Sequence, residues 1–105
     1  MKRYVVQITD KALADMEGIY NYIAEQLQAP ENAIGQYNRI AKAIEGLDIF
    51  PERVRIMESN PEHSMGLRQL QIDNFSVFYI IEGGNVIVTR VLYSTSDISR
   101  RLLEK

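Results

Sequence analysis

The sequence contains no cysteine, no tryptophan, three prolines and a single histidine. Without cysteine there is neither a disulfide framework nor a thiolate metal site. The one histidine, His63, stands among polar loop residues, which excludes a two-histidine metal site and a histidine-centred triad. No apolar run approaches the ~20 residues needed to cross a bilayer, and the Met-Lys-Arg start lacks the pattern of a signal peptide. We therefore expect a cytoplasmic protein without membrane association, metal or cofactor, with His63 exposed.

The size and composition fit one globular domain covering residues 1–105. The chain has 105 residues, of which 46% are hydrophobic, enough to bury roughly 60–70% of the unfolded surface. A net charge of −2 disfavours binding to nucleic acid by bulk electrostatics. Most arginines nevertheless lie in the second half: Arg53, Arg55, Arg68, Arg90, Arg100 and Arg101. Ordinary solvated side chains are the simplest explanation for Arg53, Arg100 and Arg101.

The last third of the chain predicts three consecutive strands. The apolar runs are Leu67–Ile72, Phe75–Glu82 and Val86–Tyr93, and they are separated by Asp73-Asn74 and by Gly83-Gly84-Asn85. Glycine and asparagine accept the positive φ that tight hairpins require, so the pattern indicates an antiparallel meander. Apolar residues occupy both parities of the middle run, which predicts a central strand covered on both faces.

The first half predicts a strand at Tyr4–Ile8 followed by two helices. Thr9 or Asp10 can cap the first helix, and Pro30 suits the first turn of the second. The first apolar stripe consists of Ala12, Met16, Ile19, Tyr20, Ile23 and Leu27, and the second of Ala33 or Ile34, Tyr37, Ile40 or Ala41, Ile44 and Leu47. The connection is short, so the two helices form an antiparallel hairpin that Phe50-Pro51 ends.

Together these elements predict an α+β fold: a strand, a helical hairpin and a three-stranded meander. A long loop covers residues 51–65, and loops of that length are often functional. A short C-terminal helix is expected at Asp97–Glu104, where Ile98, Leu102 and Leu103 have helical spacing.

Few residues carry candidate chemistry. Arg90 interrupts an apolar strand, and burying an unpaired arginine is costly, so it should face a cleft or a carboxylate. Asp15 and Glu17 lie on a helix rich in polar residues, where solvation is the ordinary explanation. Arg68, Arg90 and Tyr93 remain as the polar set that strand geometry could gather near one sheet surface.

Four local patterns in this order resemble the RelE/ParE superfamily of toxins from bacterial type II toxin–antitoxin modules, which includes plasmid stabilization proteins. The resemblance covers nearly the whole chain. Its carriers are Ala14-Asp15-x-x-x-Ile19-x-x-Tyr22-Ile23, Ile44-x-x-Leu47-x-x-Phe50-Pro51, Gly66-Leu67-Arg68-x-Leu70 running into Asp73-Asn74-Phe75-x-Val77-Phe78-Tyr79, and Arg90-Val91-Leu92-Tyr93 before Asp97-Ile98.

The resemblance implies a growth inhibitor silenced by a cognate antitoxin whose C-terminal segment wraps it, with DNA bound only through the antitoxin. One branch of the superfamily cleaves mRNA in the ribosomal A site. There, cationic side chains stabilise the phosphate while a tyrosine or histidine assists proton transfer. The ParE branch has a longer helical hairpin and inhibits DNA gyrase without nuclease activity.

The family's site residues transfer only in part. Arg68 matches the arginine that starts the second strand, and Tyr93 matches the residue that closes the last one; with Arg90 they would be catalytic if the protein is a nuclease. Ser96 stands where the family commonly has another arginine, and the pI is about 5.4. ParE-like inhibition of DNA gyrase is therefore the leading hypothesis. A ribosome-dependent mRNA endonuclease and a non-toxic antitoxin-binding protein are the alternatives.

Overall fold

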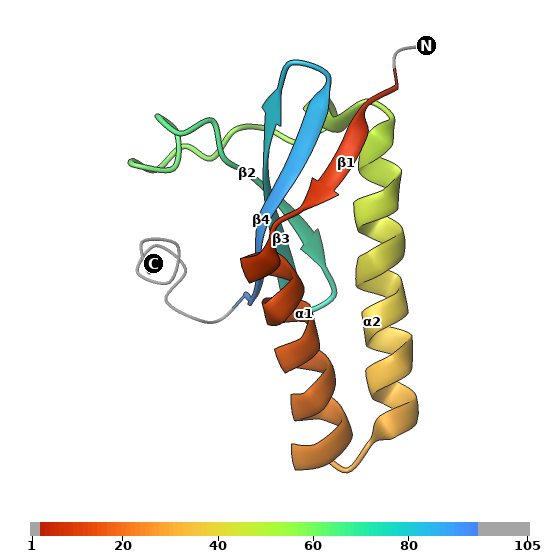
Figure 1. Cartoon of the computed structure of the whole chain (residues 1–105). Coiled ribbons are helices and arrows are strands. Elements are labelled where there is room, and N and C mark those ends of the chain that lie inside the picture. The colour runs from red at the N-terminus through yellow and green to blue at the C-terminus, as the bar shows by residue number, and fades with distance from the viewer. Residues whose placement is uncertain (1–2, 95–105) are drawn as a thin grey trace.

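The computed structural model describes residues 3–94 and confirms the α+β fold. Figure 1 shows the elements in chain order. They are β1 (Val5–Ile8), α1 (Asp10–Asn21) with a π-helical turn at Tyr22–Gln26, α2 (Pro30–Glu45), 3-10 turns at Gly46–Asp48 and Pro51–Arg53, β2 (Arg68–Ile72), β3 (Phe75–Glu82) and β4 (Asn85–Tyr93).

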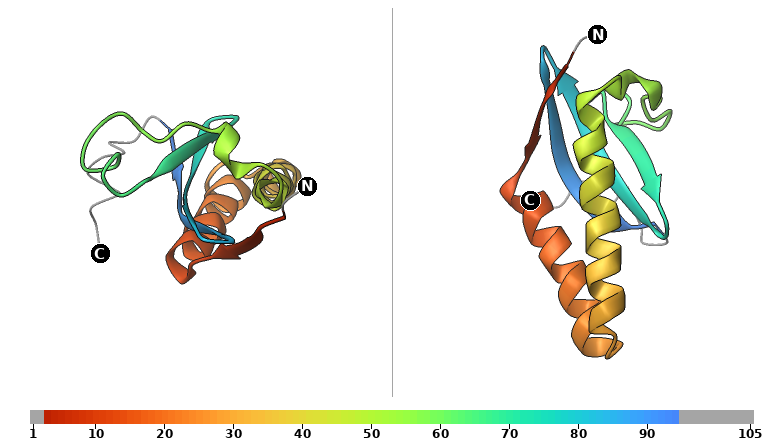
Figure 2. Two further views of the ribbon diagram at one scale, coloured as in Figure 1. Left: turned by 90° about the horizontal axis from the view of Figure 1, so that it is seen from above. Right: turned by 90° about the vertical axis from the view of Figure 1, so that its right-hand side faces the viewer.

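The four strands form one mixed sheet in the order β1-β4-β3-β2. The predicted meander of β2, β3 and β4 is antiparallel. In addition β1 pairs in parallel with β4, with Val5 opposite Asn85. A parallel pair needs a long crossover connection, and the helical hairpin begins that crossover from β1 (Figure 2).

Local backbone geometry agrees with the sequence signals at most boundaries. Thr9 caps α1 by accepting a hydrogen bond from the backbone N–H of Ala12, and Pro30 is in the first turn of α2. Asp73 and Gly83 adopt the positive φ expected of the hairpin turns, at 53° and 60°. The second turn is shorter than expected, because Asn85 already belongs to β4.

The hairpin covers one face of the sheet, and the main core lies between them. Its buried residues are Tyr4, Ala12, Met16, Ile40, Ile44, Leu47, Val77, Tyr79, Val86, Val88 and Val91. A second cluster of Leu67, Phe78 and Leu92 is also buried. Since β3 contributes to both clusters, the prediction of a central strand covered on both faces is confirmed.

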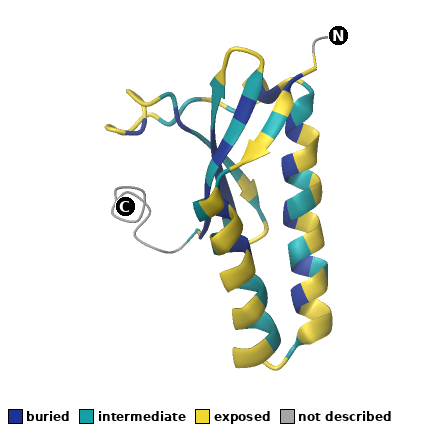
Figure 3. Cartoon of the chain, in the orientation of Figure 1, coloured by how far each residue is buried: buried dark blue, intermediate teal, exposed yellow. Residues whose placement is uncertain are grey.

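The apolar stripe of the first helix does not run as far as predicted. Leu27 was expected to be buried, but it is 57% exposed, as is Tyr22. Two causes are visible: the winding changes to π-helical at Tyr22, and the hairpin extends past the end of the sheet (Figures 1 and 3). Residues at the tip of the hairpin therefore have no sheet to pack against.

The long loop before β2 carries His63, which is exposed as expected, and Glu62, which is buried. The burial of Glu62 was not predicted, because its neighbours in the sequence are polar loop residues. The predicted helix at Asp97–Glu104, together with Ser96, lies outside the described residues.

Candidate functional site

A groove of about 1040 Å³ lies where the hairpin extends past the sheet. Its walls are α1 with the π-helical turn, one side of α2, and the ends of β3 and β4. The groove exists because the helices are longer than the sheet they cover.

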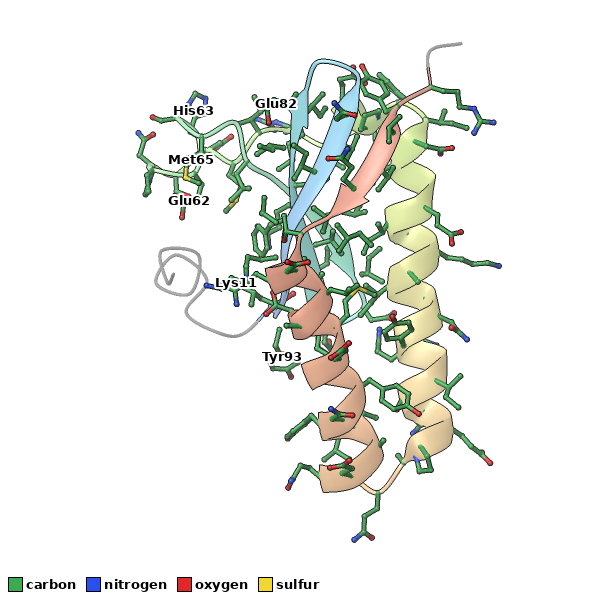
Figure 4. The ribbon with its side chains drawn as sticks, viewed as in Figure 1. Lys11, Glu62, His63, Met65, Glu82 and Tyr93 are labelled. Carbon is green, nitrogen blue, oxygen red and sulfur yellow. The ribbon has the colours of Figure 1, made fainter. Side chains whose placement is uncertain are left out.

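The α1 wall and the strand wall are largely apolar. The α1 wall contains Ala14, Ile19, Tyr22, Ile23 and Leu27, and the strand wall contains Phe75, Val91, Leu92 and Tyr93. The rings of Phe75 and Tyr93 meet edge to face, with centroids 5.5 Å apart. Tyr93 remains 47% exposed and lies beside α1 (Figure 4). Contiguous exposed apolar surface of this kind is typical of a binding site for another molecule.

The α2 wall is polar and is tied to the turn between β2 and β3. Asp73 in that turn accepts hydrogen bonds from Gln36 Nε2 at 3.0 Å and from Arg39 Nε at 2.7 Å. The hydrogen bond from Arg39 is the main reason that the pKa of the Asp73 carboxyl is lowered. This network holds the end of the sheet against the middle of α2.

A buried ion pair joins the α1 wall to β4. Asp15 accepts hydrogen bonds from Arg90 Nε at 2.7 Å and from Arg90 Nη2 at 3.0 Å, and also from the backbone N–H of Val91 at 3.0 Å. The pairing of β1 with β4 ends at Ile8 and Val88. The Asp15 carboxylate therefore takes the place of a neighbouring strand at the next part of the β4 edge. The expectation that Arg90 faces a carboxylate is confirmed.

Arg68 has a different environment. Its guanidinium donates hydrogen bonds to the backbone carbonyls of Val54 and Glu52. Its neighbour across the sheet, Tyr79, donates a hydrogen bond to the carbonyl of Pro51 at 2.7 Å. Burial raises the pKa of the Tyr79 hydroxyl, and the nearby Arg68 charge opposes that shift. Arg68 and Tyr79 thus hold the segment after α2 onto the sheet.

Two of the three candidate site residues lie at nearly the same level of the sheet. Arg90 is opposite Phe78 and Arg68 is opposite the adjacent Tyr79, so the two arginines lie on the strands that flank β3. Tyr93 is opposite Phe75 at the start of β3 and lines the groove, whereas Arg68 does not. His63 in the long loop is also remote from Tyr93 (Figure 4).

Sequence reasoning missed the groove and the role of Asp15. The expectation that Asp15 is solvated was wrong, since its side chain is only 13% exposed. One signal could have revealed it: Asp15 borders the buried stripe of Ala12 and Met16, and Arg90 needed a carboxylate. The groove had no such signal, because it depends on the relative lengths of the hairpin and the sheet.

Within residues 3–94, no histidine, aspartate and glutamate side chains gather in a set of three or more that could hold a metal ion. No helix in the same part of the chain is long and apolar enough to cross a membrane.

Comparison with known proteins identifies the family. Residues 6–98 match the family described as "ParE toxin of type II toxin-antitoxin system, parDE". No curated protein sequence matches the chain significantly.

Several solved structures are similar in fold. The chromosomal ParDE toxin–antitoxin system from P. aeruginosa aligns with a TM-score of 0.73 at 23% identity, over 87% of this chain and 96% of the other. The RelBE2 toxin–antitoxin complex from Mycobacterium tuberculosis aligns with a TM-score of 0.62 at 17% identity, over 87% and 98%. The RelB–RelE complex from Methanococcus jannaschii aligns with a TM-score of 0.50 at 14% identity, over 90% and 96%.

The structural likenesses support the fold, and the family match covers nearly the entire described chain. The chain therefore belongs to the ParE toxin family and is a toxin of a type II toxin–antitoxin system.

Proposed function

We propose that a segment of a cognate antitoxin occupies the groove, and that the free toxin inhibits DNA gyrase in the cytoplasm. The observation that carries the first part is the exposed apolar wall of the groove, where Tyr22, Leu27 and Tyr93 face solvent.

Two observations support an antitoxin segment as the occupant of the groove: the kind of surface, and the partners of similar folds in solved structures. Amphipathic helices bind proteins by laying an apolar face into a groove of this type. The solved structures with similar folds include complexes of a toxin with its antitoxin. A groove beside an exposed helical hairpin offers such a segment a long contact surface.

The contacts of the candidate catalytic residues favour gyrase, rather than RNA, as the target. Arg90 is neutralised by Asp15, and Arg68 donates to the backbone carbonyls of Glu52 and Val54 in the segment after α2. Phosphodiester cleavage would need cations and a proton-transfer group around one phosphate, and residues 3–94 do not bring Arg68 and Tyr93 together. The net charge of −2 also disfavours work inside ribosomal RNA.

A ribosome-dependent endoribonuclease is the second candidate. It is favoured by one observation: the Tyr93 side chain is accessible at the groove.

The test is to induce the toxin alone in a bacterial host and to measure growth, the SOS response and mRNA cleavage together, with supercoiling by purified gyrase as the direct assay. We expect arrest with SOS induction, inhibited supercoiling and uncut messages. Tyr93→Phe keeps the ring and removes only the hydroxyl, so it should remain toxic. Rapid translation arrest with cut messages, abolished by Tyr93→Phe in a folded protein, would establish the nuclease instead.

A further inference from the structure

Two glycines stand in the middle of the groove-lining helices. Gly18 is in α1 and Gly35 is in α2, and both line the groove. Glycine destabilises a helix interior relative to alanine. Neither position has a positive φ that would require glycine.

The packing of this chain does not require them either. A Cβ at Gly18 would meet nothing within 4 Å, and a Cβ at Gly35 would touch only the Arg39 guanidinium at an ordinary 3.5 Å. The two glycines therefore lower the stability of the helices, and no close contact within the described structure requires a glycine at either position.

The two glycines lie about one helical turn apart along the hairpin. The rings of Tyr20 and Tyr37 touch across the hairpin, with centroids 6.2 Å apart, and each glycine is two residues before one of these tyrosines. In antiparallel helices that places Gly18 and Gly35 about one helical turn, roughly 6 Å, apart along the hairpin. Both positions line the groove, and the wall has no side chain at either of them; this part of the wall is here called the notch.

The groove also has two unlike sides. The α1 side presents Tyr22, Ile23 and Leu27, whereas the α2 side presents Glu31, Asn32, Gln36 and Arg39. A segment that fills it must be apolar on one side and polar on the other. An amphipathic helix has that pattern at the period of 3.6 residues.

We propose that Gly18 and Gly35 form the seat at which an amphipathic helix of the antitoxin comes closest to the toxin, with one large apolar side chain inserted into the notch. The inference rests on the proposed function, because it takes the antitoxin as the occupant of the groove. The glycines then favour the complex at the expense of the stability of the free toxin.

The experiment measures two quantities for each variant: the thermal midpoint of the free toxin and its Kd for the protein encoded by the adjacent reading frame. Gly18→Ala and Gly35→Ala should each raise the midpoint, by roughly 2–6 °C, because alanine favours the helix. Both should weaken binding about ten-fold or more, because an added methyl group overpacks a closely packed contact. Gly46→Ala is the matched control: its Cβ would also meet nothing within 4 Å, and it does not line the groove. It should leave the Kd unchanged.

An unchanged Kd in both groove variants would overturn the seat, and so would a lowered midpoint in both, since the fold would then need the glycines. Leu27→Ser and Tyr22→Ala separate this failure from failure of the proposed function. If they weaken binding while the glycine variants do not, the antitoxin uses the groove without the seat. If none of the four changes the Kd, the antitoxin binds elsewhere and both proposals fail.

Discussion

The Asp15 carboxylate accepts hydrogen bonds both from a side chain and from the backbone at the edge of β4. It bonds the buried Arg90 guanidinium and the backbone N–H of Val91. From the sequence, the need for a carboxylate at Arg90 could be predicted from the cost of burying a charge. The identity of that carboxylate could not be predicted, because Asp15 is far from Arg90 in the sequence. Only the packing of α1 on β4 brings the two residues together.

Removing Asp15 should therefore destabilise the toxin strongly. Asp15→Ala leaves the Arg90 charge and the Val91 N–H without this partner, and breaking a buried pair typically costs about 3–5 kcal/mol. Urea unfolding would measure the loss. Arg55→Ala is the control, because its pair with Glu58 lies on the surface and is worth at most about 1 kcal/mol. A loss below that of Arg55→Ala would show that Asp15 is not structural.

Asp73 should make stability sensitive to acid. Its pKa is lowered from the usual 3.8, chiefly by the hydrogen bond from Arg39, so its contribution is present above about pH 4 and is lost as the pH falls through the lower folded pKa. Asp73→Asn keeps a residue that tolerates the positive φ at this turn. We expect the difference in thermal midpoint between the two proteins to shrink between pH 5 and pH 2, taken as roughly the range over which such carboxyls titrate. A difference independent of pH would contradict this account.

At the scale of elements, the helices and the meander were accessible from the sequence because their signals are local. Proline, the Thr9 cap and the positive-φ turn residues fix element ends, and apolar periodicity fixes the faces. The exposure of Leu27 was not accessible in this way, since it depends on where the sheet ends. The pairing of β1 with β4 was not accessible either, because an apolar strand carries no local mark of its partner.

The start of α1 depends on one hydroxyl. Thr9 Oγ1 accepts from the N–H of Ala12 at 3.1 Å and donates to the carbonyl of Thr89 at 3.2 Å. Thr89 is the extra residue of β4 where its pairing with β3 shifts register. Thr9→Ala should cost about 1–2 kcal/mol of unfolding free energy, whereas Thr9→Ser should cost less because it retains the hydroxyl. Denaturant unfolding of both variants measures this, and equal losses would show that the methyl group, not the cap, matters.

For the whole molecule, the charge balance predicts how the complex responds to salt. The toxin has a net charge of −2. Two walls of the groove, the one formed by α1 and the one formed by the strands, are largely apolar. Antitoxin binding should then rest on apolar burial more than on charge, so its Kd should change only mildly with ionic strength. Titrations at low and high salt would measure the slope. A loss of several orders of magnitude in affinity would mean that charged contacts dominate.

The parallel pairing of β1 with β4 also bears on how the toxin is made. The residues joined by this pairing, such as Val5 and Asn85, are separated by most of the chain, and such distant contacts form late in folding. During synthesis the hairpin emerges first, at roughly 5–20 residues per second, but Asp15 meets Arg90 only after β4 has followed. The nascent chain consequently has no finished groove until its last strand is in place. Translation thereby imposes a delay between the start of a toxin molecule and its ability to recognise either its inhibitor or its target.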